Sequence, residues 1–498
     1  MKFLARLEKK KMCWLLIVFS LIFFFLRLPS LIEPYWYGDE GIYEVVGKSM
    51  DQGRVLYKNI WDNKPPLLYV VYALAQGDQP SVKAISLVVG ILSIIAFFLL
   101  SQQLFKKQLI SFVTTFLFMI LLGTPLLEAN IANAESFILL PIIIAGIIIY
   151  KLVLKQKGSS TRSLFIAGLL LGLAFLFKIV AVFDLSAFVL FFLFAQLPEH
   201  LSWTIFKKTL ISKKILIPLR TIIFGFVLPF LIAVIYFALN NALLGFFQSA
   251  FFDNYDYVAW QNGFFGITQG LLILKCIVLI IAIAFVLKKR KKFSTHTLFI
   301  SLWLTLSLFN AYFSGRTYTH YAIVILPSFC LFIGLLFTHL KAKNKIIVAV
   351  ATLVLIIALS LQFSFNPIRS CLYYQNVIQF INGQKNVIDY QSFFDQKVPR
   401  DYSVATFIRS YTKPTDAVFI WGNNPQIYAL ADKLPIGKYT VAYHISQISA
   451  FKETQKVLIQ SKPKYIIVLT ESQPLPFAAP LYIMRYTISG ATIYERSL

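Results

Sequence analysis

The sequence predicts a polytopic α-helical membrane protein with a small α/β domain at its C-terminal end. Of its 498 residues, 58% are hydrophobic and only 14% are charged, a composition far outside the range of soluble globular chains. Apolar runs of about 20 residues, the length that crosses a bilayer as a helix, recur along most of the chain with basic clusters between them. After about residue 365 these runs end and the composition changes sharply.

The lengths of the apolar runs and the positions of the basic clusters predict eleven membrane spans. The first run follows Lys9, Lys10 and Lys11 and has no small-residue cleavage site, so we expect an uncleaved signal anchor. Lys178 and Asp184 interrupt the apolar stretch between 163 and 196; two spans are assigned there because a single span would move the later basic clusters to the other side. The predicted spans are 13–32, 82–105, 108–124, 136–154, 163–178, 179–196, 216–239, 269–287, 296–313, 320–340 and 346–364.

The excess of basic residues is explained by topology. The formal net charge of +25 would suggest a nucleic-acid partner in a soluble protein. Here the lysines and arginines lie in short clusters between spans, such as Lys288 to Lys292, as the positive-inside rule requires of cytoplasmic loops. Because no basic stripe with interleaved aromatics accompanies them, we predict no nucleic-acid binding. The protein is expected in the cell membrane, with a cytoplasmic N-terminus and an extracytoplasmic C-terminal domain.

Two domains are expected. Residues 1–364 form the transmembrane domain, with a long first outer loop at 33–80, and residues 365–498 form an exofacial α/β domain. Within the second domain, apolar runs predict two short buried strands, at 417–422 and 464–469. Between them, helical spacing of the apolar residues predicts an amphipathic helix over 445–461.

The first outer loop begins with two adjacent acids, in "YWYGDEGIYEVVGKSM" from Tyr35 to Met50. Apolar residues after Ile42 follow helical spacing, which predicts an amphipathic helix over 39–52 lying at the membrane surface. Asp39 and Glu40 start this helix, and they suit an N-cap and a first-turn acid favoured by the helix dipole. The same two carboxylates also suit chemistry at the level of the lipid headgroups, and both interpretations stand.

A lysine beside two prolines follows in the same loop, in "NIWDNKPPLLYVVYAL". Pro65 keeps Lys64 out of the helical region, and proline suits the first turn of the helix that we expect next. A lysine at a helix start is a good phosphate ligand, because its ammonium and the free backbone N–H groups favour the same anion. The alternative is that Lys64 extends only to lipid headgroups.

Together, "YGDEGIY" and "WDNKPPLLY" in the first outer loop of a many-span chain resemble the GT-C membrane glycosyltransferases. The resemblance is strongest to the bacterial branch similar to the protein O-mannosyltransferases, which use dolichyl- or polyprenyl-phosphate mannose, and to the aminoarabinose transferases of lipid A. Three later stretches extend it: "AESFILLP" (134–141), "GRTYTHYAIVILPSFCLFIG" (315–334) and "DAVFIWGNNPQIYALADKLPIGKY" (416–439).

This resemblance implies an enzyme that transfers a hexosyl or pentosyl group from a polyprenyl-phosphate donor to an acceptor lipid, glycan or protein on the outer face, with inversion at the anomeric carbon. The acceptor hydroxyl must lose a proton, so the reaction needs a carboxylate base. A polyprenyl phosphate leaves without protonation, so cations should stabilise its negative charge. The residues that match are the catalytic Asp39 (general base) and Glu40, the donor-phosphate ligands Lys64, Arg316 and His320, and the acceptor-binding or second acid Glu135.

Several alternatives stay open. Glu135 also fits an interfacial acid at the start of a span. The chain has no HxxH motif or carboxylate cluster that would demand a metal, so no metal ligands are assigned, although some relatives bind a divalent cation. A flippase or transporter of lipid-linked sugars, or a polysaccharide polymerase or ligase, would also have many spans. Those proteins are expected to place key residues at the midplane or in a late loop, not near residue 39.

Overall fold

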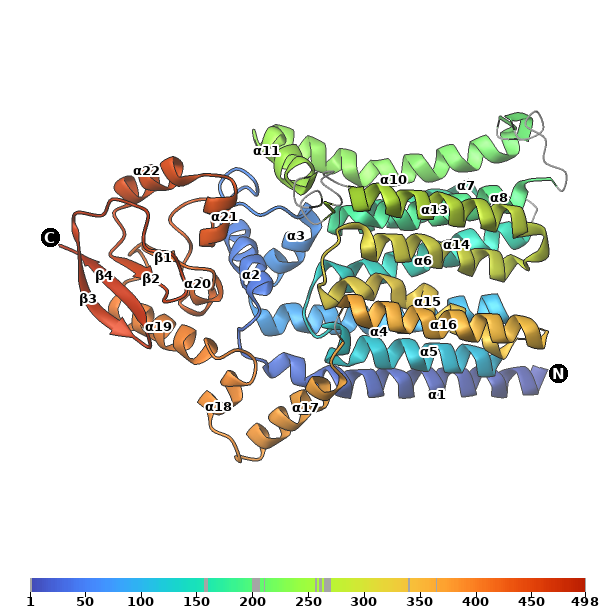
Figure 1. The fold of residues 1–498 in the computed structure, drawn as a ribbon, viewed down its shortest axis with the longest axis horizontal. Coiled ribbons are helices and arrows are strands. Elements are labelled where there is room, and N and C mark those ends of the chain that lie inside the picture. Colours follow the sequence, from blue (N-terminus) through green and yellow to red (C-terminus); the bar gives the residue numbers. More distant parts are fainter. Residues whose placement is uncertain are drawn as a thin grey trace. The chain divides into compact units, whose positions relative to one another are not determined.

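The structure is a computed structural model, and it describes residues 2–155, 160–198, 207–209, 211–255, 258, 262–263, 270–338, 341–363 and 365–497 (Figure 1). The chain divides into two compact units. Unit 1 comprises Met1–Leu28, Ile85–Ile235 and Asp253–Ser370, and unit 2 comprises Pro29–Ala84, Tyr236–Phe252 and Cys371–Leu498. Unit 2 therefore combines the first outer loop with the C-terminal region, an association that the sequence did not indicate.

Unit 1 is a bundle of long helices that run side by side (Figure 1). Its elements are α1 (Lys2–Arg27), most of α4 (Gln79–Phe105), α5 (Gln108–Gly123), η2 (Pro125–Leu127), α6 (Ala134–Lys155), α7 (Thr161–Phe177), η3 (Ile179–Ala181), α8 (Val182–Gln196), most of α10 (Lys213–Leu239), α13 (Gly270–Lys289), η5 (Arg290–Lys292), α14 (Thr295–Phe313), η6 (Thr319–Ile325), α15 (Leu326–Gly334), η7 (Leu335–Phe337) and α16 (Ala342–Phe363).

The predicted spans are present. Within the described residues, nine helical segments are long and apolar enough to cross a membrane, and the shorter apolar helices α5 and α7 match the other two predicted spans. Lys178 separates α7 from η3 in an extended conformation, which confirms two helices between 163 and 196. The protein is a multi-pass membrane protein.

Close helix packing in unit 1 depends on small residues. A Cβ atom at Gly168 would lie 2.1 Å from the Ile222 carbonyl oxygen, and one at Gly172 would lie 2.3 Å from that of Phe226. From the opposite helix, a Cβ at Gly225 would lie 2.3 Å from the Phe165 carbonyl oxygen. The glycines of α7 and α10 thus let the two backbones touch, as small residues do between membrane helices.

Unit 2 contains a four-stranded sheet with helices around it. Its elements are η1 (Leu28–Ile32), α2 (Gly38–Asp51), α3 (Pro66–Leu74), α11 (Leu243–Phe247), the π-helical η4 (Gln248–Phe252), most of α17 (Pro367–Ile381), α18 (Val387–Ser392), α19 (Val398–Tyr411), β1 (Val418–Trp421), α20 (Gln426–Leu430), α21 (Ala442–Gln447), α22 (Phe451–Ser461), β2 (Tyr465–Val468), β3 (Tyr482–Ile488) and β4 (Ala491–Arg496). The strand order is β1-β2-β4-β3; β1 and β2 are parallel, and the other neighbours are antiparallel.

The two predicted strands are confirmed as β1 and β2, which pair from Val418 with Tyr465 to Trp421 with Val468. The helix predicted over 445–461 is confirmed over Phe451–Ser461 as α22, but it is interrupted before that point. The chain forms α21 and α22 there, because Ser449 takes a positive φ of 55° between them. Strands β3 and β4 were not predicted, since β3 is largely exposed and has no apolar run.

The helix predicted over 39–52 is confirmed as α2, but it does not lie with an open polar face at a surface. Helices α3 and α20 pack against it, and its buried residues include Glu40 and Glu44. Two glycines permit this packing: a Cβ at Gly41 would lie 2.8 Å from the Gln426 nitrogen, and one at Gly47 would lie 2.6 Å from the Tyr72 carbonyl carbon.

Helix α3 instead presents apolar side chains outward. Val70 and Leu74, one turn apart, are 37% and 78% exposed, while Leu68, Tyr69 and Tyr72 on its other side are buried. Within the first outer loop, α3 is thus a helix that has exposed apolar side chains on one side and buried ones on the other.

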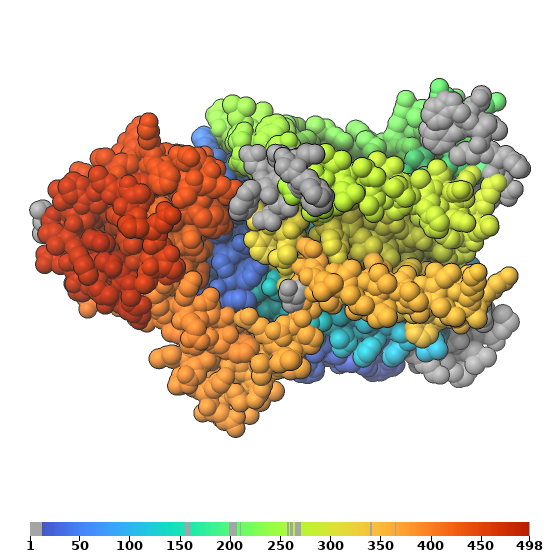
Figure 2. Space-filling view, viewed as in Figure 1, coloured from blue at the N-terminus to red at the C-terminus, as the bar shows by residue number. Residues whose placement is uncertain are grey.

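The segment of α18 and the end of α17, orange in Figure 2, protrudes from the surface of unit 2. Tyr373, Tyr390 and Phe394 form its small apolar core, and the Tyr390 hydroxyl donates a 3.0 Å hydrogen bond to the Ile32 carbonyl. This segment is thus anchored to the start of the first outer loop.

Candidate functional site

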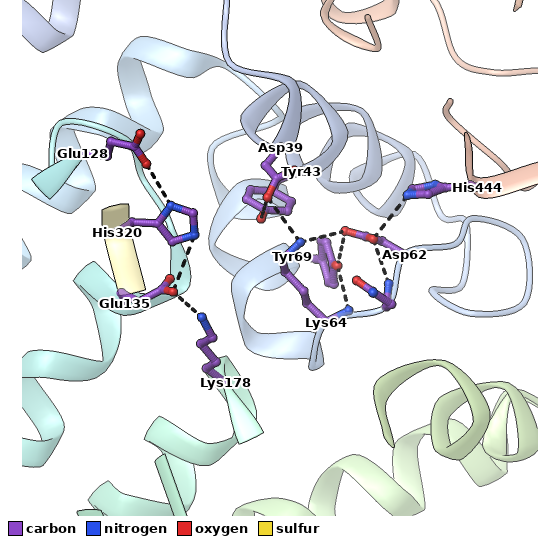
Figure 3. Close-up of polar contacts among 11 residues, drawn as sticks. Asp39, Tyr43, Asp62, Lys64, Tyr69, Glu128, Glu135, Lys178, His320 and His444 are labelled. Atoms are coloured by element: carbon purple, nitrogen blue, oxygen red, sulfur yellow. Dashed lines mark hydrogen bonds and ion pairs between the residues drawn. The ribbon is translucent and has the colours of Figure 1, made fainter. Parts of the chain in front are cut away.

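The first turn of α2 and the loop before α3 bring two sequence-predicted residues together in unit 2. Lys64 Nζ lies 3.6 Å from Asp39 Oδ2 (Figure 3). Both side chains are partly exposed, Lys64 at 31% and Asp39 at 38%. This carboxylate and this ammonium can therefore both contact a ligand.

Asp39 is not the N-cap of its helix. Helix α2 begins at Gly38, the preceding Tyr37 makes no capping side-chain hydrogen bond, and Asp39 lies in the first turn. The Tyr43 hydroxyl, one turn along, donates a 3.1 Å hydrogen bond to Asp39 Oδ2, and Lys64 Nζ lies 4.7 Å from the centre of the Tyr43 ring. Tyr43 thus holds both members of the pair, the acid by a hydrogen bond and the lysine by a cation–π contact.

The backbone around Lys64 is fixed by buried tyrosines. The Tyr57 hydroxyl donates to the Lys64 carbonyl at 2.5 Å, and the Lys64 N–H donates to the Tyr69 hydroxyl at 3.3 Å. Pro65 has extended backbone angles and Pro66 is the first residue of α3, as the sequence predicted. Lys64 is therefore held at a helix start by contacts on both sides of its peptide.

Asp62 is a site residue that the sequence analysis missed. It is buried, accepts a 2.6 Å hydrogen bond from the Tyr69 hydroxyl, and lies 3.9 Å from Lys64 Nζ. The ammonium of Lys64 thus lies close to two carboxylates, those of Asp39 and Asp62.

The tyrosine hydroxyls of this cluster act as donors. Burial, and then the negative charges of Asp39 and Asp62, raise the pKa of Tyr43 well above its usual value. The same causes, with Asp62 as the charged neighbour, raise the pKa of Tyr69. Both hydroxyls stay protonated, so they stabilise the carboxylates without adding charge.

The C-terminal region supplies His444 to the same cluster. Its Nε2 lies 3.7 Å from Asp62 Oδ1, and its ring stands edge-on to Trp61 with 4.7 Å between the ring centres. Burial lowers the pKa of His444 to about 4, against the opposing charge of Asp62. His444 is therefore neutral at physiological pH, and its contact with Asp62 is not a salt bridge there.

Trp61 also links the first outer loop to the C-terminal region, because its backbone N–H donates to the Lys438 carbonyl at 2.9 Å. No short sequence motif marks His444 or this contact, since about 380 residues of chain separate His444 from Asp62; only the fold brings them together.

Glu40 is placed differently from Asp39. Its side chain is 1% exposed and lies 3.4 Å from Lys83 Nζ, which is fully buried. Adjacent residues on a helix point about 100° apart, so the two acids of the motif have different surroundings. Glu40 is therefore buried beside a lysine, whereas Asp39 is partly exposed.

Unit 1 contains a second polar cluster, around Glu135 at the start of α6. Lys178 forms an ion pair with Glu135 Oε1, and His320 Nε2 lies 3.8 Å from the same oxygen. On its other side, His320 Nδ1 lies 3.0 Å from Glu128 Oε2 (Figure 3). Lys178 Nζ also lies 4.0 Å from the centre of the Tyr321 ring.

This second cluster joins two predicted residues, Glu135 and His320, with two that were not assigned, Glu128 and Lys178. Glu128 has a positive φ of 55°, a strained conformation for a residue other than glycine, and such strain is concentrated at functional sites. Arg316 lies in the stretch before η6, where its carbonyl accepts a hydrogen bond from Gln362 at 3.3 Å.

Within the described ranges, no three His, Cys, Asp or Glu side chains lie close enough together to hold a metal ion. Near Asp39 and Asp62 the cation is the Lys64 ammonium itself.

Comparisons with known proteins identify the fold. No family model matches the chain, and no curated protein matches its sequence. A crystal structure of ArnT from Cupriavidus metallidurans bound to undecaprenyl phosphate is similar, with a TM-score of 0.57, 10% identity, and coverage of 97% of this chain and 98% of ArnT. The chain has the ArnT fold.

The apo structure of the same ArnT gives a TM-score of 0.57 at 11% identity, again over 97% of this chain and 98% of ArnT. An apo structure of the Archaeoglobus fulgidus oligosaccharyltransferase aligns with a TM-score of 0.49 at 13% identity, over 92% of this chain and 69% of that protein. The ArnT fold confirms the predicted fold class, a polytopic helical membrane protein with a small C-terminal α/β region.

The buried neutral His444 predicts a pH effect on stability. Its pKa is about 4 in the folded protein and about 6.5 when unfolded. Its contribution is fully present above pH 6.5 and is lost as the pH falls through 4, by up to about 3 kcal/mol from this one group.

Replacing His444 by Gln should remove this part of the acid destabilisation. The measurement is the melting temperature of both proteins in detergent between pH 7 and pH 4. Burial raises the pKa of Asp401 to about 6, so the contribution of Asp401 to stability increases as the pH falls. Because both proteins contain Asp401, the quantity compared is the difference between their melting temperatures at each pH. Parallel curves for wild type and His444→Gln would contradict a buried neutral histidine.

Proposed function

We propose that the chain is a membrane glycosyltransferase that moves a sugar from a polyprenyl-phosphate donor to an acceptor at the extracytoplasmic face, with inversion at the anomeric carbon. The observation that carries the proposal is the partly exposed Asp39 carboxylate, 3.6 Å from the Lys64 ammonium. The ArnT fold supports it, since ArnT has been crystallised with undecaprenyl phosphate.

Asp39 and Lys64 suit the two charge changes of this reaction, the loss of a proton from the acceptor and the gain of negative charge on the phosphate. The acceptor hydroxyl gives its proton to an Asp39 oxygen as the acceptor oxygen bonds to the anomeric carbon. The bond between that carbon and the phosphate oxygen breaks, and its electron pair stays on the phosphate. Lys64 then stabilises the phosphate charge as it develops.

Other residues support the pair. The hydroxyl of Tyr43 keeps Asp39 oriented, and Asp62 with its hydrogen bond from Tyr69 holds the loop of Lys64. We propose that Arg316 is a further phosphate ligand, because a guanidinium binds phosphate in a bidentate manner that lysine cannot match.

In unit 1, His320 lies between two carboxylates, a position that favours orienting Glu135 over binding an anion. Glu135 is the proposed acceptor-binding acid.

The proposed topology has a cytoplasmic N-terminus and an extracytoplasmic C-terminal region.

The test uses the purified full-length chain in liposomes with a panel of labelled polyprenyl-phosphate sugars and candidate acceptors. A transferase releases free polyprenyl phosphate only when donor and acceptor are both present. Movement of intact donor across the vesicle membrane, without release of polyprenyl phosphate, would instead support a flippase and overturn the proposal.

Replacing Asp39 by Asn should lower the transfer rate by about 10²–10⁴-fold, the usual contribution of a general base. Donor binding should stay within about twofold, because the phosphate ligand Lys64 is unchanged. The matched control is Asp51→Asn, at the exposed end of the same helix, which should keep normal activity. Near-normal turnover by Asp39→Asn would remove Asp39 from the role of base.

Replacing Lys64 by Ala should weaken donor use by about 10–100-fold in kcat/KM, since a hydrogen bond to a charged group contributes about 1.5–3 kcal/mol. Initial rates over a range of donor concentrations measure this. Lys58→Ala is the control, because Lys58 is exposed in the same loop and binds the Asn240 carbonyl. If the donor kinetics of Lys64→Ala and Lys58→Ala are the same, Lys64 does not bind the phosphate.

A further inference from the structure

A second face of α2 carries buried charge. Glu40 and Glu44, one turn apart, are each 1% exposed, and Lys83 from the start of α4 is fully buried. Lys83 Nζ lies 2.7 Å from Glu33 Oε2 and 3.4 Å from Glu40 Oε2. The Lys83 ammonium thus lies close to two carboxylates, those of Glu33 and Glu40, which precede and begin helix α2.

The two acids beside Lys83 and Glu40 have different surroundings. Glu33 accepts hydrogen bonds from the Tyr373 hydroxyl, the Trp36 indole at 3.2 Å and Lys83.

Glu44 has no hydrogen-bond partner at either carboxylate oxygen. Burial, and then the negative charge of Glu40, raise the pKa of Glu44 well above its usual value, while the charge of Lys83 opposes them. Two buried carboxylates at i and i+4 would repel each other if both were ionised, so Glu44 carries a proton and Glu40 is the partner of Lys83.

Helix α2 begins after Tyr37, whose side chain makes no capping hydrogen bond. Glu40 lies in the first turn of this helix, and Lys83 lies in α4, whose first residue, Gln79, donates from its side chain to the Glu33 carbonyl at 3.0 Å. The Glu40–Lys83 pair therefore joins the first turn of α2 to the base of α4.

We propose that Glu40 is a positioning residue: its ion pair with Lys83 fixes the first turn of α2 and so sets the position of the Asp39 carboxylate. This inference rests on the proposed function, in which Asp39 is the base. Glu40 acts without touching substrate, because its side chain is buried beside Lys83. A misplacement of about 1 Å in a reacting group can cost about 10²-fold in rate, so loss of the pair acts on kcat.

The chain offers a matched pair of variants for the test, Glu40→Gln and Glu44→Gln. Both replace a fully buried acid of α2 by its isosteric amide, one turn apart. The first removes the charge that pairs with Lys83, whereas the second replaces a protonated acid by another neutral group. We expect kcat to fall at least about 10-fold in Glu40→Gln and to stay within about twofold in Glu44→Gln.

Two further readouts distinguish a positioning role from other roles of Glu40. The donor KM of Glu40→Gln should stay within about twofold, because Lys64 is intact, and the pH–rate profile should keep the same limbs as wild type. Loss of one limb would show that Glu40 itself transfers a proton and would overturn the inference. Equal kcat for the two variants would overturn it as well.

A third variant, Glu40→Asp, tests the inference in case Glu40→Gln does not fold. It keeps the charge but shortens the side chain by one methylene, so the positioning role predicts a lower kcat in a protein with a normal melting temperature. A wild-type kcat for Glu40→Asp would contradict the inference.

Asp39→Asn is assayed in parallel. If that variant is active, the proposed function fails; if it is inactive while Glu40→Gln matches Glu44→Gln, only the positioning role fails.

Discussion

The site in unit 2 depends on one constraint: a helix buried on nearly every side must carry one carboxylate that reaches solvent. Helices α3 and α20 enclose α2, and the contacts at Gly41 and Gly47 leave no room for a side chain. A buried helix cannot turn to adapt to a ligand, so the direction of Asp39 is set before any substrate arrives. This preorganisation has a cost, because the same helix also buries Glu40 and Glu44, and their charges must be paired or removed.

The charges around Lys64 suit a reaction in which one negative charge disappears as another forms. With His444 neutral, the cluster holds two carboxylates, Asp39 and Asp62, and one ammonium. In the proposed reaction, Asp39 becomes neutral when it takes the acceptor proton, while the phosphate gains charge. Lys64 then exchanges one anionic partner for another, and little charge has to be created in the site at any moment.

Much of the architecture follows from short-range pattern. Apolar run length and basic clusters predict every span, because both signals are local, and the proline pair predicts the helix start beside Lys64. Long-range contacts are not visible in this way. In the sequence Asp62 is an ordinary loop acid, and only the fold places Tyr69 and His444 beside it. Likewise, α2 is buried because α20, from the C-terminal region, packs against it. Similarly, Lys178 interrupts a span in the sequence, and only the fold gives it Glu135 as a partner.

The adjacent acids of the motif show most clearly what sequence alone leaves undecided. Asp39 and Glu40 are both carboxylic acids in the first turn of the same helix, and each lies within 3.6 Å of a lysine ammonium. They differ in exposure: the Asp39–Lys64 pair is 38% and 31% exposed, whereas the Glu40–Lys83 pair is almost completely buried. An ion pair that water and ligands reach can exchange its partner, and a buried pair cannot without a large loss of stability. The rotation of about 100° between neighbouring helical residues therefore separates the candidate base from the proposed positioning residue.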